Sequence, residues 1–142
     1  MPHVLKTMNE ITRCGMQYCN DNLEPLGLKS CHASYLREIC RSPGISQDTL
    51  ARRICINKSN IARQLVVLEE GGFVRRQPSQ EDKRAMELYP TEKTLELLPR
   101  IRQILGQWSR YLTQDLTEEE VEVLSRVLTS MKARATIWME EN

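Results

Sequence analysis

Residues 58–70 carry a group of polar side chains at helical spacing. On a helical wheel the apolar residues of this segment fall on one side, and most of the polar ones fall on the other side with Val67. The polar and basic residues that we single out are Lys58, Ser59, Asn60, Arg63 and Gln64. Arginine pairs with guanine, asparagine and glutamine pair with adenine, and serine can bind phosphate. The alternative is an ordinary amphipathic helix with a solvated polar face.

A second group of charged side chains lies between Phe73 and Tyr89. Asp82 and Arg84 are separated by one residue, so in an extended strand both project to the same side. The carboxylate could then hold the guanidinium in a bidentate pair. A positioned arginine suits the narrow minor groove of A·T-rich DNA. The residues expected to contact phosphates are Arg75, Arg76 and Lys83. The alternative is a hairpin that its charges merely keep soluble.

The distribution of charge favours a local nucleic-acid surface. The net charge of the whole chain is only +1. Residues 46–84, however, carry eight basic and five acidic groups, whereas residues 113–142 carry three basic and seven acidic groups. A basic centre beside an acidic end is the pattern that binding to a polyanion requires.

Capping residues predict three short helices, the last of which is the polar segment 58–70. The first begins with Ser30 as N-cap and ends at Arg41. Ser46 and Asn57 cap the next two, and Gly71 follows the end of the third. Because few residues separate the second and third helices, this pair matches a helix-turn-helix.

The period then changes from helical to extended. The runs 73–77 and 84–89 read as two strands, and the polar stretch 78–83 reads as the turn between them. A helix-turn-helix followed by a hairpin is the order of a winged helix. The predicted fold is therefore mainly α with a small β-hairpin wing.

Longer helices are predicted on both sides of this unit. A helix covers about residues 3–22, weakened by Gly15. A long helix from Pro90 to about Leu112 should be kinked or loosened by Pro99. Its predicted stripe is Leu95, Leu98, Ile101, Leu105, Trp108 and Leu112. The last helix begins with a capping box and carries Val121, Leu124, Val127, Leu128, Met131 and Ala135.

Composition excludes several classes of protein. The chain has 142 residues, 40% of them hydrophobic and 27% charged, which is ordinary globular usage. Its longest apolar run, residues 65–68, is far shorter than a membrane span. The first residues lack the features of a signal peptide, so we expect a cytoplasmic protein. The five cysteines include no Cys-x-x-Cys pair, which argues against a zinc finger and a disulfide-stapled domain.

From about residue 26 to 131 the chain resembles the multiple antibiotic resistance regulator (MarR) family of winged-helix transcription factors. The resemblance is carried by residues 44–51, 58–65 and 68–76, and most specifically by Asp82-Lys83-Arg84-Ala85 with Thr91-Glu92-Lys93. Two departures are the Thr at position 94, where the family often has Gly, and Pro99.

The resemblance implies a homodimer that binds palindromic promoter DNA, usually as a repressor, and that responds to a small phenolic or lipophilic effector. It implies that residues 1–28 and 92–142 form a helical dimerisation region and that residues 29–91 form the DNA-binding lobe. It places Ser59, Asn60, Arg63 and Gln64 in the major groove. Arg84 would enter the minor groove, steadied by Asp82.

The apolar stripes of the first and last helices also favour a dimer, independently of the resemblance. The stripe of the last helix continues through Ile137 and Trp138, and the first helix has a stripe as well. One subunit of this size could leave both uncovered. The alternative is that the two helices pack on each other within one chain.

Sensing residues are harder to identify from the sequence. By resemblance to the family, an effector pocket would be lined by Met16, Tyr18, His32, Tyr35 and Trp108. Some relatives sense oxidants with a cysteine in the first helix, which singles out Cys14 and Cys19 as candidates. Small core residues are the alternative for these cysteines.

Two other classes of function are alternatives to a DNA-binding regulator. A winged-helix module for protein interaction would expose an apolar recognition face and lack an arginine at the wing tip, and the sequence shows the opposite. An enzyme would need a nucleophile with a base, or a metal cluster. With two histidines and no catalytic spacing, we predict no enzyme, no metal site and no cofactor.

Overall fold

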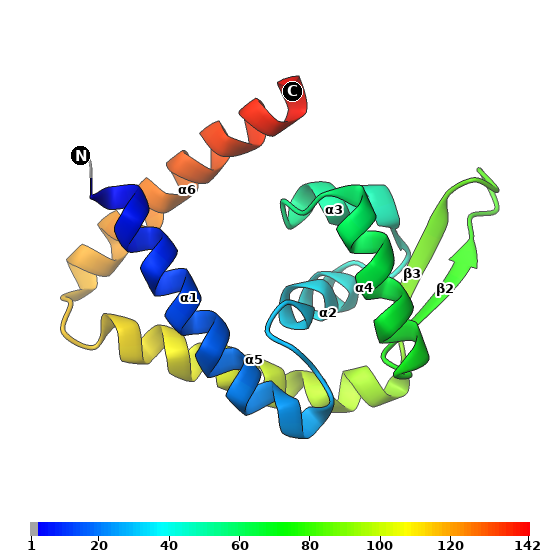
Figure 1. Cartoon of the computed structure of the whole chain (residues 1–142), viewed down its shortest axis with the longest axis horizontal. Coiled ribbons are helices and arrows are strands. Elements are labelled where there is room, and N and C mark those ends of the chain that lie inside the picture. The colour runs from blue at the N-terminus through cyan, green and yellow to red at the C-terminus, as the bar shows by residue number, and fades with distance from the viewer. Residues whose placement is uncertain (1–2) are drawn as a thin grey trace. The chain divides into compact units, whose positions relative to one another are not determined.

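A computed structural model of the chain describes residues 3–142 (Figure 1). The chain forms two compact units, one ending at Trp108 and one comprising Ser109–Asn142. Within the described residues, no helix combines the length and the apolarity needed to cross a membrane. The predicted fold class, mainly helical with a small β wing, is confirmed.

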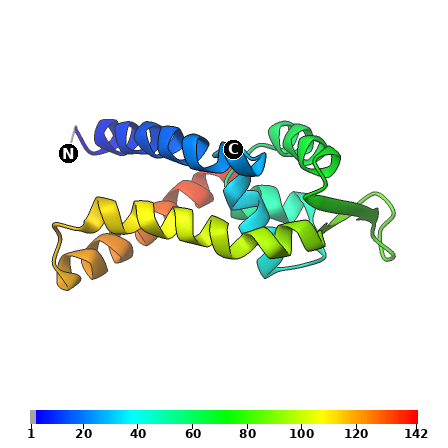
Figure 2. The ribbon, with the colours of Figure 1, turned by 90° about the horizontal axis from the view of Figure 1, so that it is seen from below.

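In the first unit, α1 (Val4–Leu23) lies beside the part of α5 (Glu92–Thr113) that ends at Trp108 (Figures 1 and 2). The Tyr18 hydroxyl donates to the carbonyl oxygen of Ile104 at 2.9 Å, and its ring stacks on Trp108 with centroids 4.8 Å apart. A Cβ at Gly15 would lie 3.0 Å from Nε1 of Trp108. The glycine that weakens the helical pattern therefore permits this close approach.

The helix-turn-helix has the predicted order. A short 3₁₀ helix (Glu24–Leu26) leads to α2 (His32–Arg41), and α3 (Gln47–Arg53) and α4 (Lys58–Glu70) follow. Ser46 Oγ accepts the Thr49 N–H at 3.1 Å, so the predicted cap of α3 is confirmed.

The predicted N-cap of α2 is wrong. Cys31 occupies that position and makes no side-chain cap, whereas the Ser30 N–H donates to Asn20 Oδ1 at 2.7 Å. The residue is used to fasten the loop to the end of α1. Helix α2 therefore begins one residue later than the capping pattern predicted.

The sheet of the wing has three strands, one more than the sequence predicted. Strands β2 (Val74–Pro78) and β3 (Met86–Pro90) form the expected antiparallel hairpin. A short strand, β1 (Ile45–Ser46), pairs with the other edge of β3, so the order is β1-β3-β2. Two residues carry no periodicity of their own, and β1 exists because β3 lies beside it.

One buried core holds the first unit together, with contributions from α1, α2, α3, α4, the sheet and α5. On α5 the buried positions are Thr94, Leu98, Ile101 and Ile104. Leu95, placed in the stripe by the sequence, is instead exposed, because the buried Thr94 hydroxyl donates to the Phe73 carbonyl oxygen at 2.6 Å. This bond ties α5 to the start of the wing. The helix is continuous through Pro99.

In the second unit, α6 (Glu118–Glu141) begins with the predicted capping box of Thr117 and Glu120. None of its residues is buried. Its exposed apolar side chains are Val121, Val123, Leu124, Val127, Leu128, Ile137, Trp138 and Met139.

Candidate nucleic-acid interface

Helix α4 is fixed to the core by one face. Ile61, Leu65 and Leu68 are 0%, 0% and 1% exposed, as the wheel predicts. Ser59 and Arg63 are exposed and Asn60 is half-buried. Gly71 and Gly72 end the helix, and the positive φ of Gly72 (78°) turns the chain into the wing.

The first turn of α4 is ordered by its cap. Asn57 Oδ1 accepts the Asn60 N–H at 2.8 Å and the Ser59 hydroxyl at 2.9 Å. Lys58 lies 3.8 Å from Asp48 in an ion pair whose side chains are 77% and 68% exposed. Such exposed pairs contribute little to stability, so phosphate could replace Asp48 as the partner of Lys58.

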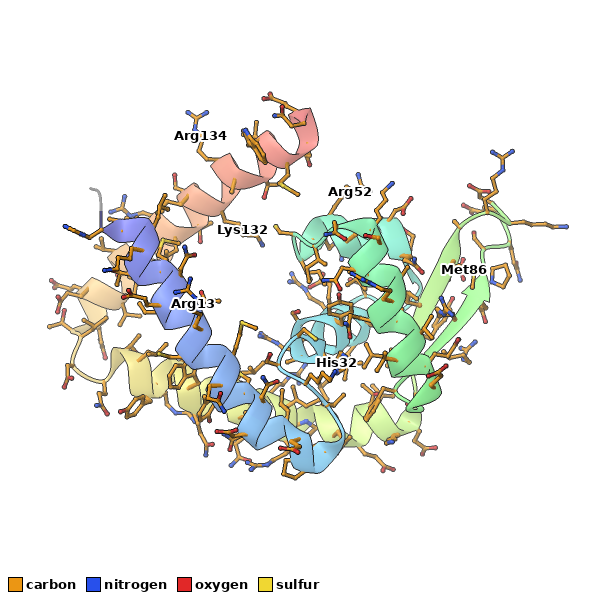
Figure 3. The ribbon with its side chains drawn as sticks, in the orientation of Figure 1. Arg13, His32, Arg52, Met86, Lys132 and Arg134 are labelled. Atoms are coloured by element: carbon orange, nitrogen blue, oxygen red, sulfur yellow. The ribbon has the colours of Figure 1, made fainter. Side chains whose placement is uncertain are left out.

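The turn between α3 and α4 is short and well defined. Cys55 adopts the left-handed conformation, with φ 59°. The Ile54 N–H donates to the Leu50 carbonyl oxygen at 3.1 Å, and the Ile56 N–H donates to that of Ala51 at 3.1 Å. Arg53 on α3 bonds Glu38 on α2 at 2.9 Å, whereas Arg52 is exposed (Figure 3). These contacts position α4 against the rest of the lobe.

Gln64 differs from the other predicted reading residues. It is half-buried, and its Oε1 lies 2.9 Å from Nε2 of His32 on α2. The Cys31 thiol is a further, weak neighbour at 3.9 Å. The structure therefore brings Ser59, Asn60 and Arg63 to an accessible face but places the Gln64 oxygen against the protein.

At the wing tip, Asp82 organises the backbone. Its Oδ1 accepts the Arg84 N–H at 3.0 Å, and its carbonyl oxygen accepts the Ala85 N–H at 2.9 Å. The predicted bidentate pair with the Arg84 guanidinium is wrong, because residues 82–84 form a turn in which the amide is the nearer donor. In the described part of the chain, no salt bridge involves Lys83 or Arg84, and both side chains are exposed.

The two arginines of β2 make contacts within the protein. Arg76 donates to Glu69 at the end of α4 at 3.0 Å, and this hydrogen bond lowers the pKa of Glu69. The Arg75 guanidinium lies 4.6 Å from the centroid of the Tyr89 ring. Arg76 thus joins the recognition helix to the wing, a role that the sequence did not indicate. Arg75 remains exposed.

A polar network stiffens the same hairpin. The Tyr89 hydroxyl donates to Glu87 at 2.8 Å, and Gln77 donates to the same carboxylate oxygen at 3.4 Å. The bond to Glu87 raises the pKa of Tyr89. Cross-strand register explains the pairing, since Gln77 faces Glu87 and Arg75 faces Tyr89.

The five residues of the predicted effector pocket form two groups and one exposed side chain. Tyr18 stacks on Trp108, and His32 meets Tyr35 edge to face at 6.5 Å. Met16 is exposed. The Tyr35 hydroxyl is buried without a hydrogen-bond partner among the described residues, and burial raises its pKa to about 12.

The two candidate redox cysteines differ in exposure. Cys14 is exposed, and Cys19 is buried. Burial raises the pKa of the Cys19 thiol, the opposite of what a reactive thiolate requires.

Comparison with known proteins agrees with this geometry. Residues 30–86 match the model of the MarR family. The chain is 30% identical over 128 residues to YybA, an uncharacterized HTH-type transcriptional regulator of Bacillus subtilis (strain 168), covering 90% of this chain and 85% of that protein.

Two solved structures are similar over almost the whole length. The transcriptional regulator SlyA is 28% identical with a TM-score of 0.92, covering 96% of each chain. A MarR family transcriptional regulator from Listeria monocytogenes, solved with a 26mer DNA, is 25% identical with a TM-score of 0.90, covering 98% of this chain and 95% of that one. The chain therefore belongs to the MarR family: it is a winged helix-turn-helix, DNA-binding transcriptional regulator and not an enzyme.

Proposed function

We propose that the chain is a homodimeric repressor that reads a palindromic operator through two lobes and is released by a small effector. In each lobe, α4 lies in the major groove and the wing tip lies in the minor groove. The observation that carries the proposal is that α4, whose apolar face is buried, exposes Arg63, while Arg84 at the wing tip is also exposed and makes no salt bridge with any described residue.

The major-groove contacts are assigned to the accessible face of α4. Arg63 is exposed and can present its guanidinium to guanine. Asn60 and Ser59 lie in the first turn, where recognition helices contact bases and phosphates. Lys58 adds a phosphate contact. The similar Listeria protein was solved with a 26mer DNA, which supports DNA as the partner of this face.

The minor-groove contact is assigned to Arg84. Asp82 fixes the backbone of the turn and leaves the guanidinium without a salt bridge in the described chain. The negative potential of a narrow A·T-rich groove favours a side chain of this kind. Lys83 and Arg75, both exposed, are the phosphate contacts beside it.

The dimer is assigned to the end helices, in line with the predicted regions 1–28 and 92–142. On α6, Leu124 and Leu128 are 40% exposed and Trp138 is 62% exposed. On α1, Val4 and Ile11 are exposed as well. A twofold dimer would cover such faces with a second copy, and its operator would be a near-palindrome.

The effector is proposed to be phenolic or lipophilic. Tyr18, Trp108, His32 and Tyr35 are the aromatic groups that support it, with Met16 as an exposed apolar neighbour. Aromatic side chains commonly line pockets for apolar ligands, and the Tyr35 hydroxyl has no hydrogen-bond partner within residues 3–142. Quenching of tryptophan fluorescence by a phenolic probe, compared with Trp108→Leu, tests this part of the proposal.

The central test is selection of bound duplexes from a random library. We expect the wild-type chain to recover a near-palindromic consensus with half-sites about one helical turn apart. Arg63→Ala should relax the preference at one base pair of each half-site. Recovery of the same consensus with equal stringency would exclude Arg63 as a reader.

A further inference from the structure

His32 is a buried histidine whose two ring nitrogens both have partners. It lies on α2 (Figure 3), and only 2% of its surface is exposed. The Lys29 N–H donates to Nδ1 at 3.0 Å, so Nδ1 must carry the lone pair. The ring proton is then on Nε2, which lies 2.9 Å from Gln64 Oε1. His32 therefore donates to the amide oxygen of a residue on the recognition helix.

This hydrogen bond restricts what Gln64 can do on DNA. A glutamine that reads adenine uses its oxygen and its NH₂ group together. The Gln64 oxygen accepts from His32 at 2.9 Å and, more weakly, from the Cys31 thiol at 3.9 Å, so both of its lone pairs have donors within the protein. Reading adenine would break that bond and leave a buried N–H without a partner, which is unfavourable.

We propose that Gln64 is a positioning residue and that the His32–Gln64 hydrogen bond sets the rotation of α4 about its axis. The apolar contacts of Ile61, Leu65 and Leu68 hold the helix to the core but have little directional preference. A hydrogen bond between a buried ring and α4 is directional. Arg63 is the adjacent residue, so its direction toward the bases follows from the same rotation.

The inference rests on the proposed function, because a positioning role needs a base-reading helix to position. It is tested first without DNA, by ¹⁵N NMR of the imidazole ring. We expect His32 to be the neutral tautomer protonated at Nε2, with a ring signal that moves in Gln64→Met. A ring protonated at Nδ1, or a signal indifferent to Gln64→Met, would overturn the inference.

The second test compares neighbouring residues by selection from a random duplex library. Gln64→Met keeps the length of the side chain and removes the acceptor. It should recover the wild-type consensus but bind that duplex about tenfold more weakly, as expected if only about a tenth of the free chains then hold α4 in the rotation that binds DNA. Arg63→Ala is the matched control and should change the consensus. If Gln64→Met changes one base pair of the consensus, or binds the duplex as tightly as wild type does, the inference is wrong.

Variants of His32 complete the experiment. His32→Phe keeps an aromatic ring and should weaken binding as much as Gln64→Met, and the double variant should be no weaker than either. His32→Gln, which retains an N–H donor, should restore part of the affinity. Thermal unfolding of each variant shows whether the lobe remains folded. A wild-type chain that selects no consensus contradicts the proposed function and, with it, the positioning role of Gln64, whereas a failed NMR test overturns the inference and leaves the proposed function standing.

Discussion

Helices α4 and α6 are both amphipathic, yet among the described residues α4 buries its apolar face and α6 does not. In α4, the apolar residues Ile61, Leu65 and Leu68 are at most 1% exposed, and the outward face is polar. In α6, no residue is buried, and Val123 and Trp138 are 49% and 62% exposed. An exposed polar face suits a polyanion, whereas an exposed apolar face suits another apolar surface. The two helices therefore call for different partners.

The comparison also separates two kinds of energy. The apolar face of α4 stabilises the fold of one chain. We propose that the apolar face of α6 stabilises association, so its contribution depends on protein concentration. Matched leucine-to-alanine substitutions in α4 and α6 should therefore separate the two contributions.

The largest expected effect is on folding, from Leu65→Ala in α4. Leu65 is fully buried. Removing its side chain leaves a cavity and should lower the free energy of unfolding by about 2–5 kcal/mol. Urea denaturation measures this, and the loss should not vary with protein concentration. A loss below about 1 kcal/mol would contradict the packing of α4.

The same substitution in α6, Leu124→Ala, should act on the dimer instead. Leu124 is 40% exposed in the single chain. We expect sedimentation to show dissociation at lower concentration and operator binding to weaken with it. Deleting residues 132–142 should give monomers outright. A deletion variant that sediments as an intact dimer would show that α6 does not hold the two copies together.

A smaller effect is expected at the wing, from Arg84→Ala. The exposed guanidinium is assigned to the minor groove, so its loss should weaken binding most at A·T-rich flanks, by about 1–3 kcal/mol. Lys83→Ala is the matched control and should reduce affinity uniformly across sequences. Competition between duplexes with A·T and G·C flanks distinguishes the two. Equal losses of affinity for the two kinds of duplex would contradict the assignment of Arg84 to the minor groove.

The smallest effect is the pH dependence of stability. Burial lowers the pKa of His32 below its ordinary 6.5, and Lys29 acts in the same direction. Below that value the unfolded chain takes up a proton that the folded chain resists, so stability should fall as the pH drops from 6.5 through the lower folded pKa. Cys31 and Tyr35, the other titratable neighbours, have raised pKa values and stay protonated over this range.

Urea denaturation between about pH 7.5 and pH 5 measures this slope. His32→Phe should reduce it. His3→Gln is the control, because it removes the other histidine of the chain, which is exposed. A wild-type slope that persists unchanged in His32→Phe would assign it to other groups.

Much of the recognition unit could be predicted from local sequence. The Asn57 cap, the terminal glycines and the three buried positions of α4 all follow from capping and periodicity. These features depend on neighbours within a few residues. The hairpin was predicted for the same reason, although β3 begins at Met86 and not at Arg84.

The remaining errors involve contacts between distant segments. Ser30 bonds Asn20, Thr94 bonds Phe73, and β1 depends on β3. Gln64 lies at the border of the two faces of α4, where a helical wheel does not show whether the side chain points outward. Its hydrogen bond with His32 turns the side chain toward the protein. One further error is local: the predicted pair of Asp82 with the Arg84 guanidinium is wrong, because in the turn the Arg84 backbone N–H donates to Asp82 instead.

The most direct test of the central claim is fluorescence anisotropy with the duplex selected by the wild-type chain and a random duplex, over a salt series. We expect wild type to prefer the selected duplex by about a thousandfold or more, with a steep salt dependence. The double variant Arg63→Ala/Arg84→Ala should lose most of that preference while remaining folded and dimeric. Equal preference for the selected duplex in both proteins would contradict reading of DNA by α4 and the wing tip.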